Sequence, residues 1–79
     1  MRHIARHGIK PQEAEEAIRT EPLETDVQPH EGEERVLCFG RTNAGRLLTV
    51  LYTERRGKFR VVTAYEMIRL QQQLYFDGK

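Results

Sequence analysis

Three segments rich in β-branched and aromatic residues, joined by very short connections, constrain the fold of this chain most. The segments are Arg35–Arg41, Arg46–Glu54 and Lys58–Val62, and both connections, residues 42–45 and 55–57, contain glycine. Such short connections bring consecutive strands side by side in antiparallel order. The sequence therefore predicts a meander of three strands, each paired with its neighbour along the chain.

Two helices and a weaker strand are expected ahead of this meander. Met1–His7 is expected to form a short helix that ends at Gly8, because glycine favours the left-handed conformation found at helix ends. Pro11–Arg19 predicts a second helix, since its apolar residues recur at helical spacing and proline favours the first helical position. Leu23–Val27 is expected as an edge strand, followed by a polar loop at Gln28–Glu34.

Another helix is expected after the meander. Thr63–Glu66 has the Ser/Thr-x-x-Glu order of a capping box, which satisfies the first backbone amides of a helix. Met67, Leu70 and Leu74 recur on one face of the helix that would follow, down to about Phe76. The predicted fold class is α+β: two short N-terminal helices, an antiparallel sheet of three to four strands in a meander, and a C-terminal helix, in one domain over residues 1–79.

The size of the chain limits its hydrophobic core. A chain of 79 residues buries roughly 60% of its unfolded surface, so disulfides, a metal or a partner usually add stability. Cys38 is the only cysteine, which excludes an internal disulfide and makes apolar packing its expected role. Oligomerisation or a partner protein is therefore the expected source of support. The lone cysteine and the lack of an export signal or a long apolar run predict a cytoplasmic protein with no membrane segment.

Charge is unevenly distributed along the chain, although the formal net charge is only +1. Pro11–Glu34 contains nine acidic residues and one base, Arg19, whereas Arg35–Thr63 contains seven bases and one acid, Glu54. Six of the seven bases are arginine, whose planar guanidinium matches phosphate oxygens. We expect this basic half either to bind an anionic polymer or an acidic partner, or to form a sheet edge that its charges keep soluble.

The expected strand register places three large side chains in one row. Loops of four and three residues would set Arg35 opposite Tyr52 and Tyr52 opposite Arg60, all on one face of the sheet. Two guanidiniums beside a phenol can hold a phosphate while a base stacks on the ring. The same row can also be a packing arrangement with cation–π attraction and no ligand. A one-residue shift in either hairpin would remove the row, because it moves every side chain to the other face.

Few other groups in the sequence offer chemistry. His3 and His7 would share a helix face, but two ligands alone do not make a metal site, and none is predicted. His7 can transfer protons near neutral pH, or it can simply cap the helix that it ends. No hydrolytic triad, phosphate loop or dinucleotide motif is present. Any catalysis must use Arg, Lys, His, Tyr and Glu, a set that can cleave RNA without a metal or cofactor.

Four stretches of the chain, taken in order, resemble the BrnT-like toxins of bacterial toxin–antitoxin pairs. They are His-Ile-Ala-Arg-His-Gly at 3–8, Pro-Gln-Glu-Ala-Glu-Glu-Ala at 11–17, Phe-Gly-Arg-Thr-Asn-Ala-Gly-Arg-Leu-Leu-Thr-Val at 39–50 and Arg-Val-Val-Thr-Ala-Tyr-Glu-Met at 60–67. The resemblance implies a fold similar to the RelE-type ribonuclease toxins. It also implies a cognate ribbon-helix-helix antitoxin, BrnA-like, with which the toxin can form an oligomer.

The leading hypothesis is therefore a toxin that cuts RNA without a metal. Arg60 and Arg69 would stabilise the phosphate, and His7 or Tyr65 would transfer the protons. The residues expected to bind RNA are Arg35, Arg41, Tyr52 and Arg56.

Two alternatives stay open. The resembled family often has arginine where Tyr65 stands, and charged residues in the last helix where this chain has Gln71–Gln73. These departures favour a catalytically weakened relative that keeps only an antitoxin-binding or RNA-binding surface. The other alternative is an unrelated interaction module with the same sheet topology.

Overall fold

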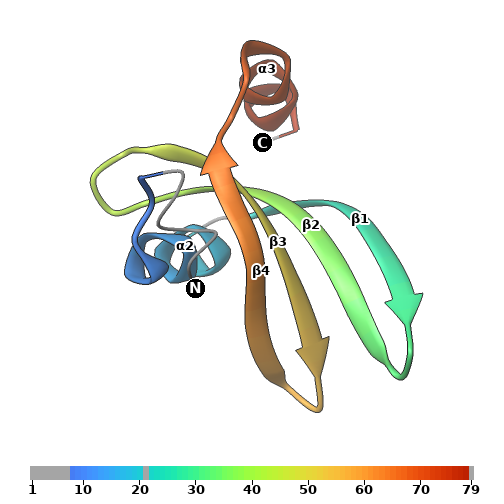
Figure 1. The fold of residues 1–79 in the computed structure, drawn as a ribbon. Helices are drawn as coiled ribbons and strands as arrows, with labels where there is room; N and C mark the ends of the chain where they lie inside the picture. Colours follow the sequence, from blue (N-terminus) through green and yellow to red (C-terminus); the bar gives the residue numbers. More distant parts are fainter. Residues whose placement is uncertain (1–7, 21, 79) are drawn as a thin grey trace.

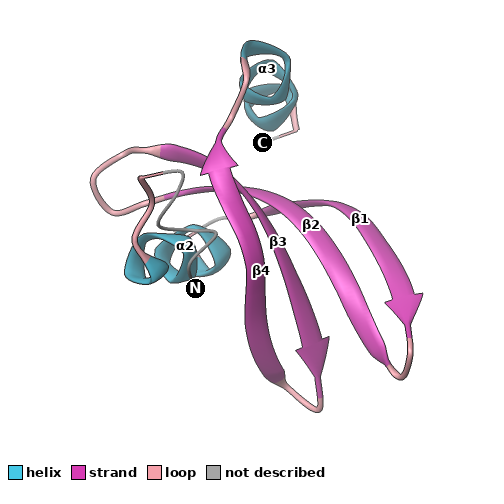
Figure 2. Cartoon of the chain, in the orientation of Figure 1, coloured by secondary structure: helices cyan, strands magenta, loops and turns pink. Residues whose placement is uncertain are grey.

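A single antiparallel sheet organises the chain, as seen in a computed structural model that describes residues 8–20 and 22–78 (Figure 1). The strands are ordered β1-β2-β3-β4, so each pairs with its neighbour along the chain, as predicted. The α+β class is confirmed (Figure 2). The elements are α2 (Pro11–Arg19), β1 (Leu23–His30), β2 (Glu33–Arg41), β3 (Leu47–Arg55), β4 (Lys58–Glu66) and α3 (Arg69–Asp77).

The two helices pack on opposite faces of this sheet. Side chains alternate along a strand, so residues two apart share a face. α2 covers a buried cluster that includes Cys38, Leu48 and Val50. α3 instead packs its Tyr75 into a smaller cluster with Phe39, at the end of the sheet remote from the β1–β2 and β3–β4 turns (Figure 1). Among the described helices, neither α2 nor α3 therefore covers this face near those two turns.

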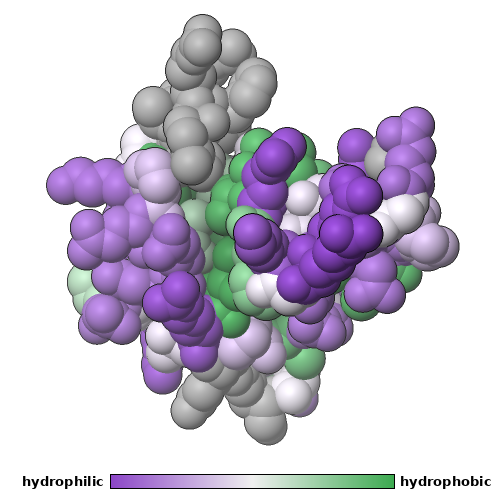
Figure 3. Space-filling view, turned by 90° about the horizontal axis from the view of Figure 1, so that it is seen from below, coloured by the Kyte–Doolittle hydropathy of each residue, from purple (hydrophilic) through white to green (hydrophobic). Residues whose placement is uncertain are grey.

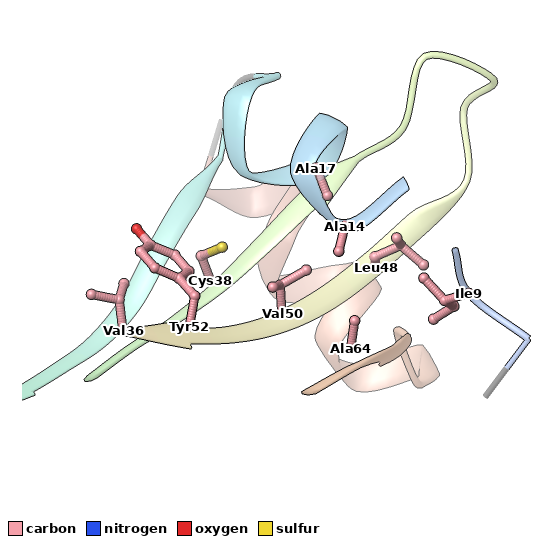
Figure 4. Packing of buried hydrophobic residues seen from close by; sticks show 9 residues of the cluster. All are labelled: Ile9, Ala14, Ala17, Val36, Cys38, Leu48, Val50, Tyr52 and Ala64. Carbon is pink, nitrogen blue, oxygen red and sulfur yellow. The ribbon is translucent and has the colours of Figure 1, made fainter. Parts of the chain in front are cut away.

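The core under α2 depends on small residues that let helix and sheet approach closely (Figure 4). Ala14 and Ala17 are both fully buried. Gly40 on β2 lies against the helix backbone, so a Cβ added there would overlap the carbonyl oxygen of Ala17 and lie 2.7 Å from its carbonyl carbon. This contact fixes how closely α2 packs on the sheet.

The region ahead of the meander differs from the predictions in two ways. The expected helix at Met1–His7 lies outside the described residues, so one helix, α2, precedes the sheet in the part that the structure describes. The polar loop expected at Gln28–Glu34 is wrong. The turn there consists of Glu31 and Gly32, with φ angles of 51° and 83°, and strand pairing continues on both sides. Two positive φ angles are typical of the tightest hairpin turns.

The predicted start of the last helix is also wrong. Thr63–Glu66 does not cap a helix but continues β4, where it pairs with Leu48–Leu51 of β3. Sheet pairing satisfies these backbone groups, and a capping-box sequence cannot compete with it. α3 begins at Arg69, and the Gln71 side chain accepts a hydrogen bond from the Ile68 amide at 3.1 Å.

The strand register differs from the predicted register by one residue. The β2–β3 connection has five residues, so Arg35 pairs with Thr53, and Tyr52 pairs with Val36. The β3–β4 turn has two residues, Arg56 and Gly57, with φ angles of 54° and 79°. The predicted Arg35–Tyr52–Arg60 row is therefore wrong, and Tyr52 lies on the face that packs against α2.

Candidate functional site

A groove of about 490 Å³ opens at the β3–β4 turn, on the uncovered part of the sheet. It lies on the same face as α3 but at the opposite end of the strands, because its β3 residues Thr53 and Arg55 share the face of Phe39. The residues that line it are Glu33, Thr53, Arg55, Arg56, Lys58, Phe59 and Arg60. Basic side chains predominate, so we name this site the hairpin groove.

Two arginines flank a small residue at the centre of this region. Arg35 pairs with Thr53 across β2 and β3, and Thr53 pairs with Arg60 across β3 and β4. The two arginines are exposed and stand two strand spacings apart, roughly 10 Å. Thr53 is 8% exposed and its hydroxyl donates a 3.5 Å hydrogen bond to the Arg60 carbonyl. The predicted residue at this position, Tyr52, would have filled the space between the two arginines. Thr53 is smaller and leaves that space open.

The charge of the hairpin groove is strongly positive. Arg55, Arg56, Lys58 and Arg60 all line it, and Glu33 is the one carboxylate among its lining residues. The ion pairs that the structure gives for residues 8–20 and 22–78 lie elsewhere, where Arg46 joins two glutamates. Guanidiniums gathered around a hollow with little compensating negative charge suit a phosphate-bearing ligand.

The residues predicted for the site divide between the two ends of the sheet. Arg35, Arg56 and Arg60 lie at the turn end, and the structure brings them together around or beside the hairpin groove. Tyr65 is five residues from Arg60 along β4, so the two are roughly 16 Å apart along the strand.

The other predicted residues are further from the groove. Arg41 ends β2 and Arg69 begins α3, and both lie at the end where α3 packs (Figure 1). His7 lies outside the described residues. The structure therefore separates the predicted catalytic arginines from each other.

Tyr52 and Tyr65 have structural contacts in this fold. Tyr52 is 3% exposed, and its hydroxyl donates a 3.4 Å hydrogen bond to Glu24. Burial raises the pKa of Tyr52 well above its usual range. Tyr65 accepts a hydrogen bond from Gln71 at 3.3 Å, and Gln71 accepts one from Thr49 at 2.9 Å. This chain of hydrogen bonds attaches α3 to the sheet.

Cys38 is buried among apolar residues, so the prediction of a packing role is confirmed. Burial raises the pKa of its thiol to about 12, which leaves it protonated near neutral pH. Within residues 8–20 and 22–78, no cluster of three metal-ligating side chains is found. In the same part of the chain, neither helix has the length and apolar character needed to cross a membrane.

The sequence prediction missed five residues of the hairpin groove: Glu33, Thr53, Arg55, Lys58 and Phe59. Glu33 was assigned to a loop, and Thr53 was assigned to the wrong face by the register error. Phe59 is apolar and yet 55% exposed, which the sequence pattern alone does not indicate. The two-residue Arg56-Gly57 turn is the signal that places the groove residues of β3 and β4, since it sets the register of that hairpin, and the Glu31-Gly32 turn is the signal for Glu33.

Comparison with known proteins identifies the family. A family model described as "Ribonuclease toxin, BrnT, of type II toxin-antitoxin system" matches residues 1–70. No curated protein and no solved structure matches the chain. The matched region contains the whole sheet and the hairpin groove. The chain therefore belongs to the BrnT family of ribonuclease toxins from type II toxin–antitoxin systems.

Proposed function

We propose that this chain is an endoribonuclease toxin that binds and cuts RNA in the hairpin groove without a metal. The main support for the proposal is that Arg60 lines a hollow on a part of the sheet that neither α2 nor α3 covers, and that Arg35 stands two strands from Arg60 on the same face. Family membership supports an RNA substrate and an antitoxin partner. Phosphate contacts from arginine position a nucleic acid strand, whatever its sequence.

The groove contains the groups that metal-independent cleavage needs. In the proposed reaction the 2′-oxygen of a ribose attacks the adjacent phosphorus while the Glu33 carboxylate accepts the hydroxyl proton. Arg35 and Arg60 stabilise the added negative charge on the phosphate oxygens. The bond from phosphorus to the 5′-oxygen then breaks, and that oxygen takes a proton from the Lys58 ammonium. The products are a 2′,3′-cyclic phosphate and a 5′-hydroxyl.

Three residues that the sequence predicts to be catalytic, Tyr65, Arg69 and His7, have smaller roles in this proposal. Tyr65 and Arg69 lie at the opposite end of the sheet from the groove, and Tyr65 is hydrogen-bonded to Gln71. Glu33 replaces Tyr65 as the proposed proton acceptor because it lines the groove. His7, outside the described residues, stays a second candidate for proton transfer.

The partner in this proposal is a type II antitoxin, which is a protein. We propose that it is of the ribbon-helix-helix, BrnA-like type and that it acts in the cytoplasm. An inhibitor of this site must neutralise the cations of the hairpin groove, so we expect it to place acidic side chains against Arg55 and Arg60. Covering the groove in this way would exclude RNA.

A second function is favoured by one observation. The glutamine run is partly used for packing, because Gln71 contacts both Thr49 and Tyr65. A helix committed to structure adds no charge to a catalytic site, which supports a catalytically weakened relative that binds RNA or the antitoxin without cutting. The two functions differ in whether RNA is cleaved.

The deciding experiment is cleavage of a labelled RNA by the purified chain in excess EDTA. We expect wild-type protein to cut and the Arg60→Ala variant to lose about 100- to 1,000-fold in rate, as when a transition-state charge donor is removed. Arg69→Ala is the matched control, and its rate should stay within a few-fold of wild type. RNA that is bound but left intact by folded wild-type protein would instead establish the weakened relative.

A further inference from the structure

We infer that a second groove, on the other side of β4, binds a nucleobase of the RNA strand held in the hairpin groove, with Phe59 as the stacking surface. The inference rests on the proposed function, because it assumes that RNA occupies the hairpin groove. It adds a base-binding site to the phosphate contacts proposed for the hairpin groove.

The second groove lies between α2 and β4 and measures about 480 Å³, room for a planar base. Figure 3 looks toward the hairpin turns from below and shows a strip of hydrophobic surface between hydrophilic regions on either side. The residues that line this base groove are Pro11, Glu15, Ile18, Arg19 and Lys58–Val61. Its floor is therefore apolar and its rim is charged.

Phe59 is exposed but held in place. Phe59 is 55% exposed, although an aromatic ring gains free energy when it is buried. Its ring meets the Tyr52 ring edge to face, with centroids 5.3 Å apart and planes at 73°. Tyr52 is itself buried, so it cannot move away. A ring fixed by a buried neighbour offers a stacking surface that loses little freedom when a base binds.

The two grooves are continuous across one edge of the sheet. Lys58, Phe59 and Arg60 line both of them. β4 is the edge strand of the sheet order β1-β2-β3-β4, so none of the other three strands separates the grooves. Successive residues of a strand point to opposite faces, which places the two cations toward the hairpin groove and Phe59 toward the base groove. A nucleotide that crosses β4 can therefore place its phosphate on one side and its base on the other.

Charge around the base groove favours a nucleotide over an apolar peptide side chain. Arg19 lines it from α2, Lys58 and Arg60 line the edge that it shares with the hairpin groove, and the one acidic lining residue is Glu15. A base arrives with a phosphate that these cations can neutralise, whereas an apolar side chain would leave them without a counter-charge. Glu15 can accept hydrogen bonds from the amino groups of guanine, adenine or cytosine.

The test compares binding of two oligonucleotides by fluorescence anisotropy. One is a labelled RNA whose 2′-hydroxyls are methylated so that it cannot be cut, and the other has the same backbone but no bases. Phe59→Leu should weaken binding of the first about 5- to 150-fold, the range expected for one stacked base, and should leave binding of the second unchanged. Arg60→Ala should weaken both.

Phe76→Leu is the matched control, because Phe76 is exposed to a similar degree, 58%, but lies on α3. It should change neither affinity. Unchanged affinity of Phe59→Leu for the base-containing RNA would overturn the inference and leave the base groove to a protein side chain. An equal loss on both oligonucleotides would also overturn it. If wild-type protein binds neither, the proposed function fails with it.

Discussion

Arginines occur at both ends of the sheet, but their surroundings differ. At the end where α3 packs, Arg46 donates to the Glu66 carboxylate at 2.9 Å, to the Glu13 carboxylate at 3.2 Å and to the Gly8 carbonyl at 3.0 Å. At the turn end, Arg55 and Arg60 line a groove that has one carboxylate among its lining residues. The first arrangement ties segments of the chain together, and the second leaves cations available to a ligand.

Residue type alone therefore does not decide the role of an arginine. Arg46 is 30% exposed and joins three segments that are distant in sequence, so its charge is neutralised within the fold. The arginines of the hairpin groove stand on a part of the sheet that neither α2 nor α3 covers. The same side chain therefore stabilises one end of the molecule and, in our proposal, binds substrate at the other.

The largest change in the free energy of unfolding is expected when a glycine is replaced by alanine, and the sheet offers such a glycine at each of its two ends. Gly40→Ala places a Cβ against the backbone of Ala17, which cannot move without displacing α2. We expect a loss of at least about 3 kcal/mol in the free energy of unfolding, much of the roughly 4–12 kcal/mol expected for a chain of this size. Urea denaturation followed by circular dichroism measures it.

Gly57→Ala is the matched change at the turn end. Gly57 has a φ of 79° and no atom within 4 Å of an added Cβ, so the cost is backbone strain alone, about 1–2 kcal/mol. Equal losses at the two positions would show that the contact between α2 and β2 is looser than the structure indicates.

The next largest effect is expected on the affinity for RNA when an arginine of β2 is replaced. Arg35 and Arg41 lie on the same strand at opposite ends and were both predicted to bind RNA. We expect Arg35→Ala to weaken binding of a non-cleavable RNA about tenfold and to lower its salt dependence, because one phosphate contact is lost. Arg41→Ala should change affinity less than twofold. A larger loss for Arg41→Ala would move the RNA path to the α3 end of the sheet.

A smaller effect is expected from neutralising one arginine at each end. Arg46→Met removes the ion pairs with Glu13 and Glu66 but keeps an unbranched side chain, and it should lower the free energy of unfolding by about 1 kcal/mol. Arg55→Met at the β3–β4 turn should leave stability unchanged or slightly higher, since it reduces repulsion among the groove cations. Thermal denaturation of both variants at low and high salt separates the two ends.

The smallest effect is a pH dependence located at the α3 end. A hydrogen bond from the Lys10 backbone amide, and then contact with Arg46, hold the pKa of Glu13 below its usual range. Because this pKa is lower in the folded state than in the unfolded chain, the stabilisation is complete above about pH 4.5 and is lost as the pH falls through the folded value. Denaturation of wild type and Glu13→Gln at pH 7, 5, 4 and 3 should show a stability difference that shrinks as the pH falls. A constant difference would contradict the assigned pKa shift.

Much of the fold could be predicted from the sequence, because the strands are rich in β-forming residues and their connections are short. The meander, α2 and the presence of a C-terminal helix all followed from local patterns. The register did not, because Arg56 adopts a positive φ, which arginine rarely does. A two-residue turn in place of three pairs Arg60 with Thr53 and not Tyr52, and a five-residue connection in place of four does the same for Arg35.

The candidate site was predicted in part for a related reason. Both hairpins were shifted by one residue in the same direction, so Arg35 and Arg60 still share a row, with Thr53 in place of Tyr52 between them. Local patterns could not show that Tyr65 and Arg69 lie at the far end of β4, because that depends on where α3 packs. The end of β4 could not be predicted either, because Thr63–Glu66 has a capping-box sequence but pairs with β3 as part of the strand.

The order of the strands also affects how fast this chain can fold. Every strand pairs with the next one in sequence, and the three connections contain two, five and two residues. Closing loops of this length costs little chain entropy, and low sequence separation between contacting residues speeds the crossing of the folding barrier. The sheet can therefore form hairpin by hairpin. Packing of α2 against Leu48 and Ala64, by contrast, joins residues far apart in the chain and closes longer loops.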